Sequence, residues 1–166
     1  MGQKAPLKIP EIHSIRIHLE MAKRIRDLAL FNLAIDSKLR GIDLVGMRPV
    51  QFEITQKTRD SLEQWINVAK LGYGDCLFPS ARNRARPLST RQYAKIAHAW
   101  FDLIGLDSSH YGTHTLRRTK ATIIYRQTKN LRAVQLLLGH TKIESTVRYL
   151  GIEVDDALDM SENVEI

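Results

Sequence analysis

Apolar residues recur every three or four positions along most of the chain, which is the spacing of helices that each bury one face. The clearest stripe lies within residues 24–41 and includes Leu28, Phe31 and Ile35. Pro10 stands at a favourable first position for the preceding helix. The pattern predicts helices over residues 11–23, 24–41, 58–71, 89–105, 115–128, 131–138 and 143–150, with one more helical turn within residues 42–47.

One short segment changes to a period of two. From Val50 to Ile54 apolar and polar residues alternate, as in a strand with one buried face, so residues 49–55 are the predicted strand. Residues 71–87 are rich in Gly, Pro and Arg and predict a loop. The sequence contains no repeat and no linker. We therefore expect one mainly α domain with a small β element (α+β) over residues 1–166.

The last third of the chain carries signals for helix ends. Thr115 and Asn130 are candidate N-caps, because their side chains can accept hydrogen bonds from free backbone N–H groups. Gly139 is suited to end a helix in the left-handed conformation. Thr141 and Glu144 have the spacing of a capping box. These signals predict three short helices in succession, with a sharp turn at Gly139.

Composition narrows the class of protein. A chain of 166 residues with 43% hydrophobic content can bury a core as one soluble domain. No apolar run approaches the roughly 18 residues that a membrane span needs. The single cysteine, Cys76, cannot form an internal disulfide, so we expect a reducing cytoplasm.

The positive charge is concentrated in one segment. The net charge of +7 suggests a polyanionic partner, which composition alone leaves open as DNA, RNA or an anionic membrane. Residues 116–149 contain eight Lys or Arg and one acid, Glu144. Residues 152–166 contain six acids and no Lys or Arg. The chain is thus expected to end in an acidic tail after a basic segment.

Five polar residues stand where they suit chemistry on a phosphodiester. His114 and Arg117 lie one helical turn apart and share a face, and Arg40 ends a core helix. His140 follows the glycine that ends a helix, and Tyr149 lies near the end of the next one. Arginine binds phosphate oxygens through two N–H groups, and histidine moves protons near neutral pH. A tyrosine becomes a nucleophile when its neighbours favour the phenolate.

Three sequence motifs resemble those of the tyrosine recombinases, or phage-type integrases. They are LRGIDL around Arg40, HTLRRTKAT around His114 and Arg117, and LLGHTKIESTVRYL around His140 and Tyr149. Their order matches the family, and the resemblance extends from about Arg26 to Leu158. It implies the catalytic-domain fold of that family and site-specific recombination or integration of DNA.

The resemblance also implies a role for each residue of the set. Arg40 and Arg117 would bind the scissile phosphate, with Asp43 orienting Arg40, and His114 would assist proton movement. His140 would donate a hydrogen bond to a phosphate oxygen.

Tyr149 would then attack the phosphorus, form a 3′-phosphotyrosyl bond and release a 5′-hydroxyl. No metal, ATP or other cofactor is implied, because the phosphotyrosine retains the bond energy. His110 and His114 are four residues apart, but no Cys or carboxylate accompanies them, so a metal site is not favoured.

The sequence departs from the family pattern in two places. Relatives carry a β-hairpin with a lysine that protonates the leaving oxygen, whereas here the corresponding segment runs directly into residues 49–55 and is shortened. Lys57 is the candidate substitute. A separate N-terminal DNA-binding domain is also not expected ahead of Arg40. The alternative function is therefore an impaired integrase remnant that binds DNA without cutting it.

Further contacts with double-stranded DNA are predicted at basic residues around these motifs. The candidates are Arg118, Lys120, Lys142, Arg148, Arg82, Arg84 and Arg86. The acidic tail, residues 152–166, is expected to link copies of the chain on DNA. A helix-turn-helix transcription factor is a third possibility, but it leaves the order of Arg40, His140 and Tyr149 without a reason. The expected location is the cytoplasm of a bacterium, on the nucleoid, in a chain of bacterial or phage origin.

Overall fold

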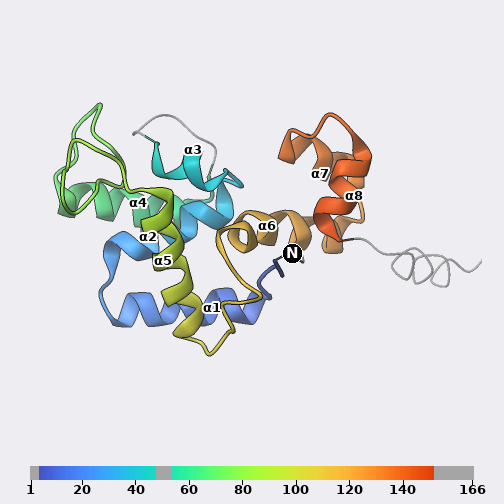
Figure 1. The fold of residues 1–166 in the computed structure, drawn as a ribbon, viewed down its shortest axis with the longest axis horizontal. Coiled ribbons are helices and arrows are strands. Elements are labelled where there is room, and N and C mark those ends of the chain that lie inside the picture. Colours follow the sequence, from blue (N-terminus) through green and yellow to red (C-terminus); the bar gives the residue numbers. More distant parts are fainter. Residues whose placement is uncertain (1–3, 48–53, 152–166) are drawn as a thin grey trace, which may run out of the picture. The chain divides into compact units, whose positions relative to one another are not determined.

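The computed structural model describes residues 4–47 and 54–151. Within these residues the chain folds into helices joined by loops (Figure 1). The helices are α1 (Ile9–Met21), α2 (Ile25–Asp36), α3 (Gly41–Val45), α4 (Gln56–Ala69), α5 (Thr90–Asp102), α6 (Thr113–Thr128), α7 (Leu131–Leu138) and α8 (Ile143–Leu150). The mainly α prediction is confirmed.

The chain divides into two compact units, residues 1–120 and residues 121–166, and we describe each by itself. The prediction of a single domain stays a prediction. The predicted strand at residues 49–55 lies outside the described residues except for its last two positions, which are not in a strand. In the described part of the chain, β pairing is limited to one isolated bridge between Pro79 and Pro87.

The first unit is built around α2, which packs against α1, α3 and α4. From Ala29 to Asp36 every residue of α2 is buried, and the two polar ones have partners, since Asn32 accepts from Arg16 and donates to Ser61 while Asp36 pairs with Lys120. Phe31 meets Trp100 of α5 edge to face with 5.4 Å between ring centroids, and Tyr93 contacts the same indole. This aromatic cluster gives the unit a rigid centre.

The second unit has a smaller core. Ala121 and Tyr125 from the C-terminal half of α6 pack with Val134, Leu138 and Leu150, while Ile124, Leu131 and Tyr149 lie against them partly buried. The apolar run at residues 136–138 predicts that Leu137 belongs to this core. It is 46% exposed, whereas its neighbour Leu138 is 9% exposed, because the two side chains point to different sides of α7.

Some helix ends form as predicted and others do not. Asn130 accepts a hydrogen bond from the Ala133 N–H at 2.9 Å, and Gly139 ends α7 with φ of +67°, as expected. The predicted cap Thr115 lies inside α6, where its hydroxyl accepts from the Gly112 N–H instead. The predicted capping box at Thr141 is also wrong. Helix α8 begins at Ile143, one residue later than a cap at Thr141 requires, and its N-cap is Lys142.

Candidate active site

Arg40 and Asp43 lie at the start of α3. Arg40 is the N-cap residue of this helix and is exposed, and Asp43 lies in its first turn, also exposed. A carboxylate in the first turn of a helix is stabilised by the positive end of the helix dipole. The short loop that joins α2 to α3 includes Lys38, which adopts a φ of +57° and turns the chain into the new helix.

His114 and Arg117 occupy the first turns of α6. They lie at i and i+3 on one helix, so they share a face. His114 is exposed and Arg117 is half-buried. Thr115 and Leu116 between them are fully buried, which fixes the rotation of this end of the helix. The arrangement predicted for this pair is present.

His140 and Tyr149 come together in the second unit. Their rings meet edge to face, with centroids 5.3 Å apart and planes at 81°. Both side chains are half-buried, and the Tyr149 ring packs against the core of the unit. The turn at Gly139 reverses the chain so that His140 faces the helix that carries the tyrosine.

Two further residues hold His140, and the sequence analysis missed both. The His140 N–H donates to the Gln135 carbonyl at 3.1 Å, and the Gln135 side-chain amide donates to the His140 carbonyl at 3.0 Å. The Thr146 hydroxyl lies 3.1 Å from Nδ1 of the His140 ring. Gln135 and Thr146 are buried. A polar residue on the buried face of a short helix is the signal that points to each of them.

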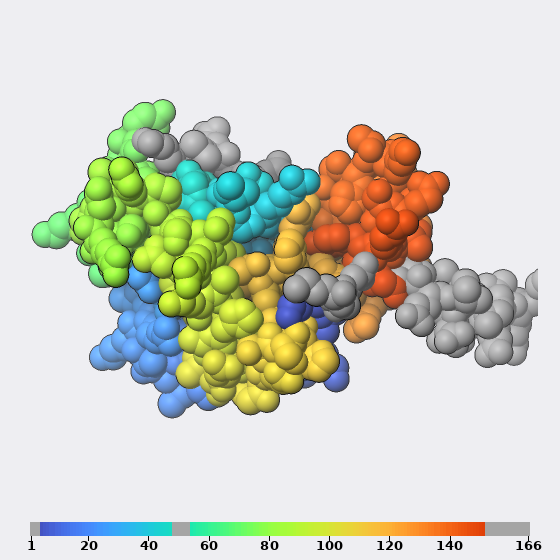
Figure 2. All heavy atoms as spheres, in the orientation of Figure 1, coloured from blue at the N-terminus to red at the C-terminus, as the bar shows by residue number. Residues whose placement is uncertain are grey.

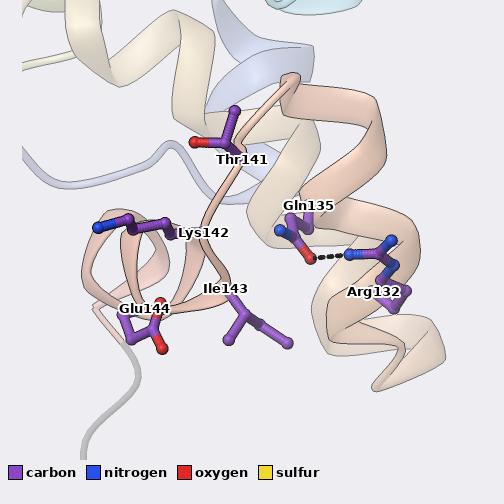
Figure 3. A pocket seen from close by; sticks show the side chains of 6 residues that line it. All are labelled: Arg132, Gln135, Thr141, Lys142, Ile143 and Glu144. Atoms are coloured by element: carbon purple, nitrogen blue, oxygen red, sulfur yellow. Dashed lines mark hydrogen bonds between the residues drawn. The ribbon is translucent and has the colours of Figure 1, made fainter.

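An open hollow of about 720 Å³ lies beside this turn (Figure 3). Arg132 and Gln135 of α7 line one side, and the start of α8 with Lys142 and Glu144 lines the other. The Arg132 guanidinium donates to the Gln135 side-chain oxygen at 2.7 Å, so one glutamine amide connects this basic residue to the backbone of His140.

The other basic residues proposed as DNA contacts differ in their surroundings. Lys142 and Arg148 are exposed in the second unit. Arg118 is only 6% exposed and donates to the Lys4 carbonyl, and Lys120 pairs with the carboxylate of Asp36. Contacts of Arg118 and Lys120 with DNA stay predictions. The bonds that these two residues make within the protein do not favour such contacts.

Arg82, Arg84 and Arg86 lie on a loop that the structure holds in a defined shape. Leu88 and Phe78 pair through the Leu88 N–H and the Phe78 carbonyl at 2.8 Å, and the Arg84 guanidinium donates to the Ala69 carbonyl at 2.6 Å. Residues 81–87 are all exposed, and the loop lies on the surface of its unit (Figure 2).

Lys57, the proposed substitute acid, is an exposed residue in the first turn of α4. Within residues 4–47 and 54–151 no group of three or more His, Cys, Asp or Glu could hold a metal ion. None of the helices described is long and apolar enough to cross a bilayer.

The chain is similar in sequence to known proteins. The profile of the phage integrase family matches residues 48–155. A probable integrase/recombinase, YoeC of Bacillus subtilis, is 30% identical over 164 residues, which cover 89% of this chain and 88% of that protein. Tyrosine recombinase XerC of Neisseria gonorrhoeae is 28% identical over 79% of this chain and 48% of its own length, so the chain spans about half of this relative.

Solved structures show the same fold. The XerA recombinase superposes with a TM-score of 0.80 at 16% identity, covering all of this chain and 66% of that one. XerH recombinase bound to its difH substrate gives 0.76 at 16% identity, covering 99% of this chain and 56% of that one. A λ integrase dimer bound to a core site gives 0.69 at 19% identity, over 100% and 52% of the two chains.

Proposed function

The chain belongs to the phage integrase family, and from this premise we propose that it cuts and rejoins DNA by transesterification through Tyr149. The observation that carries the proposal is the contact of the Tyr149 and His140 rings, whose centroids are 5.3 Å apart, in the segment that follows the turn at Gly139. A phenol held beside an imidazole places a nucleophile next to a group that can donate a hydrogen bond to the phosphate under attack.

In the proposed step the Tyr149 oxygen attacks the scissile phosphorus. The bond from phosphorus to the 5′-oxygen breaks, leaving a 3′-phosphotyrosyl bond and a 5′-hydroxyl. Arg40 and Arg117 neutralise the charge on the two non-bridging oxygens, the largest contribution that a protein makes to phosphoryl transfer. Asp43, in the first turn of the helix that Arg40 caps, orients that arginine, and His114 assists the movement of the phenol proton.

His140 acts as a donor to the phosphate, with Thr146 setting its tautomer. When the Thr146 hydroxyl donates to Nδ1, the ring proton resides on Nε2, which is then able to donate to a phosphate oxygen. Gln135 fixes the backbone of the same residue from the other side. The imidazole is therefore oriented before any substrate binds.

The proposed partner is double-stranded DNA in the bacterial cytoplasm. XerH and the λ integrase dimer, whose folds this chain shares, are bound to DNA in their structures. Exposed cations in both units supply the charge for such a partner, since neutralising phosphates accounts for most non-specific affinity. Arg82, Arg86, Lys142 and Arg148 are the exposed candidates.

The acidic tail is proposed to link copies of the chain on DNA. Residues 152–166 carry six acids together with apolar residues such as Val154 and Leu158, a composition suited to a short amphipathic segment. Native-gel analysis of DNA complexes tests this link. A chain that ends at Gly151 and still forms the same higher-order complexes would remove the tail from the proposal.

One observation favours the alternative, a protein that binds DNA without cutting it. Between the end of α3 and the start of α4, residues 46–55 contain no lysine, although the resemblance implies a lysine in this region as the general acid. A missing general acid slows a reaction by about 10²–10⁴-fold. Lys57 is the residue proposed to replace it.

A suicide substrate separates the two functions. Nicked duplexes pooled from the flanking DNA of the gene lose a short fragment after cleavage, so the protein stays attached to the DNA. We expect a denaturation-resistant adduct from the wild type, none from Tyr149→Phe, and a normal amount from Tyr125→Phe, which removes a hydroxyl from the same unit. Salt-sensitive DNA binding with no wild-type adduct from a pool that contains the recombination site supports the alternative.

A further inference from the structure

One buried carboxylate joins three helices in the first unit, the end of α2, the start of α4 and the middle of α6. Asp36 is the last residue of α2, and its side chain is 5% exposed. Its Oδ1 accepts a hydrogen bond from the Lys120 ammonium of α6 in a close ion pair. Its Oδ2 accepts from the backbone N–H of Thr55, the N-cap residue of α4, at 2.5 Å. A single side chain thus connects α2, α4 and α6.

The position of Asp36 is locally unfavourable, which indicates that it serves something other than its own helix. A carboxylate at the C-terminal end of a helix meets the negative end of the dipole. Here the cost is offset from outside α2, by the N-terminus of α4 and by Lys120. Burial alone would raise the pKa of Asp36, but hydrogen bonds from Lys120 and Thr55 outweigh it and the pKa is lowered.

The connected segments are the ones that carry the two candidate phosphate-binding arginines. Arg40 follows Asp36 by four residues, and Arg117 precedes Lys120 by three, on the same face of α6. We propose that the Asp36–Lys120 ion pair is a positioning device that fixes the Arg40 segment against the Arg117 helix, so that both arginines reach one phosphate. The inference rests on the proposed function, because it concerns the arginines of that reaction.

The charges around Asp36 explain why its loss would displace the segment that carries Arg40. Burial lowers the pKa of Lys38, and the nearby charge of Lys120 lowers it further, with Asp36 acting in the opposite direction. Burial also lowers the pKa of Arg16, again against the attraction of Asp36. If Asp36 were neutral, the repulsion between Lys38 and Lys120 would no longer be offset, and Lys38 lies two residues before Arg40.

The same helix supplies a matched control at its other end. Asp27 lies in the first turn of α2, its side chain is 4% exposed, and it pairs with Arg24 and with Arg26, the latter at 2.8 Å. Residue type, burial and ion pairing therefore match those of Asp36, but neither candidate arginine is close to Asp27 in the sequence. A general loss of stability should appear in both Asp→Asn variants, and a loss of positioning in Asp36→Asn alone.

The test measures adduct formation at saturating DNA, at a temperature where every variant is folded by circular dichroism. We expect Asp36→Asn to form the adduct about 100-fold more slowly, since a displacement near 1 Å can cost that much, and Asp27→Asn to stay within about threefold. Lys120→Met should resemble Asp36→Asn, Lys120→Arg should recover most of the rate, and the double variant Asp36→Asn/Lys120→Met should be no slower than either single one. Equal rates in Asp36→Asn and Asp27→Asn would overturn the inference.

A second measurement keeps this inference separate from the proposed function. If the wild type itself forms no adduct, the proposed function has failed, and hydrogen exchange of the free chain then decides the role of the ion pair. Asp36→Asn should speed amide exchange in both residues 41–45 and residues 113–120, and Asp27→Asn in neither. Unchanged exchange in these two segments of Asp36→Asn would show that the pair positions nothing.

Discussion

The two units hold their candidate site residues by different means. In the first unit Arg40 caps α3, which packs against α2 and α5 of the aromatic centre, and Arg117 lies in α6, which an ion pair with the buried Asp36 connects to α2. In the second unit Tyr149 and His140 rest on a small core of mainly aliphatic side chains and on hydrogen bonds to His140. The proposed function thus places phosphate binding in the unit with the larger core and the nucleophile in the unit with the smaller core.

The largest expected effect concerns the small core itself. Leu138→Ala should lower the free energy of unfolding of the second unit by about 2–5 kcal/mol, because it leaves a cavity among few neighbours. Leu137→Ala, the adjacent residue of the same type, should change it by about 0.5 kcal/mol because its side chain is half in solvent. Urea titration followed by circular dichroism measures both. Equal losses would show that Leu137 is covered and that the core is larger than described.

A smaller effect is expected from the residue that orients the imidazole. Thr146→Val keeps the shape of the side chain but removes the hydroxyl at 3.1 Å from His140 Nδ1. Adduct formation should slow by about 10- to 100-fold, while stability changes by about 1 kcal/mol. Single-turnover assays with the suicide substrate measure the rate.

Ser145→Ala is the control for this change, since Ser145 is an exposed hydroxyl on the same turn of α8. A variant Thr146→Val that cleaves as fast as Ser145→Ala would remove Thr146 from the site and leave the orientation of His140 to Gln135 alone.

The ion pair of the first unit should appear in the pH dependence of stability. The folded-state pKa of Asp36 is lowered below the ordinary value near 4. The stability from this carboxylate is therefore present above that value and is lost as the pH falls through the folded-state pKa. We expect Asp36→Asn to flatten the acid side of the stability profile, by at most about 1.4 kcal/mol per pH unit. Urea midpoints between pH 2 and pH 6 measure it, and an unchanged slope would mean that Asp36 is not paired.

The sequence predicted the helices well because their signals are local. The stripe at Phe31 and Ile35, the cap at Asn130 and the left-handed turn at Gly139 each depend on neighbours within one or two turns. Thr115 and Thr141 were misjudged because the helices begin one or two residues from the predicted positions: α6 begins at Thr113, and α8 begins at Ile143 with Lys142 as its N-cap. Leu137 was misjudged because a run of three leucines does not reveal which of them faces the core, and here only Leu138 does.

The sequence names candidate members of the site but not the residues that hold them in place. Motif spacing identifies His140 and Tyr149, and the ring contact between them agrees with that prediction. The Asp36–Lys120 pair joins residues that are far apart in the sequence, and no periodicity reports such a contact. Lys120 was predicted to contact DNA because the sequence shows its charge but does not show that Asp36 is its partner.

The smallest expected effect shows how the two units share the binding of DNA. Removing one phosphate contact lowers the slope of log affinity against log salt by about 1. We expect Arg82→Gln/Arg86→Gln, on the exposed loop of the first unit, to lower the slope by about 2, and Lys142→Gln, at the start of α8, by about 1. Fluorescence anisotropy with a labelled duplex between 50 and 200 mM salt gives these slopes. Arg59→Gln, an exposed arginine of α4, is the control and should leave the slope unchanged. A change confined to Lys142→Gln would place DNA on the second unit without the arginine loop, and a change confined to the loop would place the DNA on the first unit without Lys142.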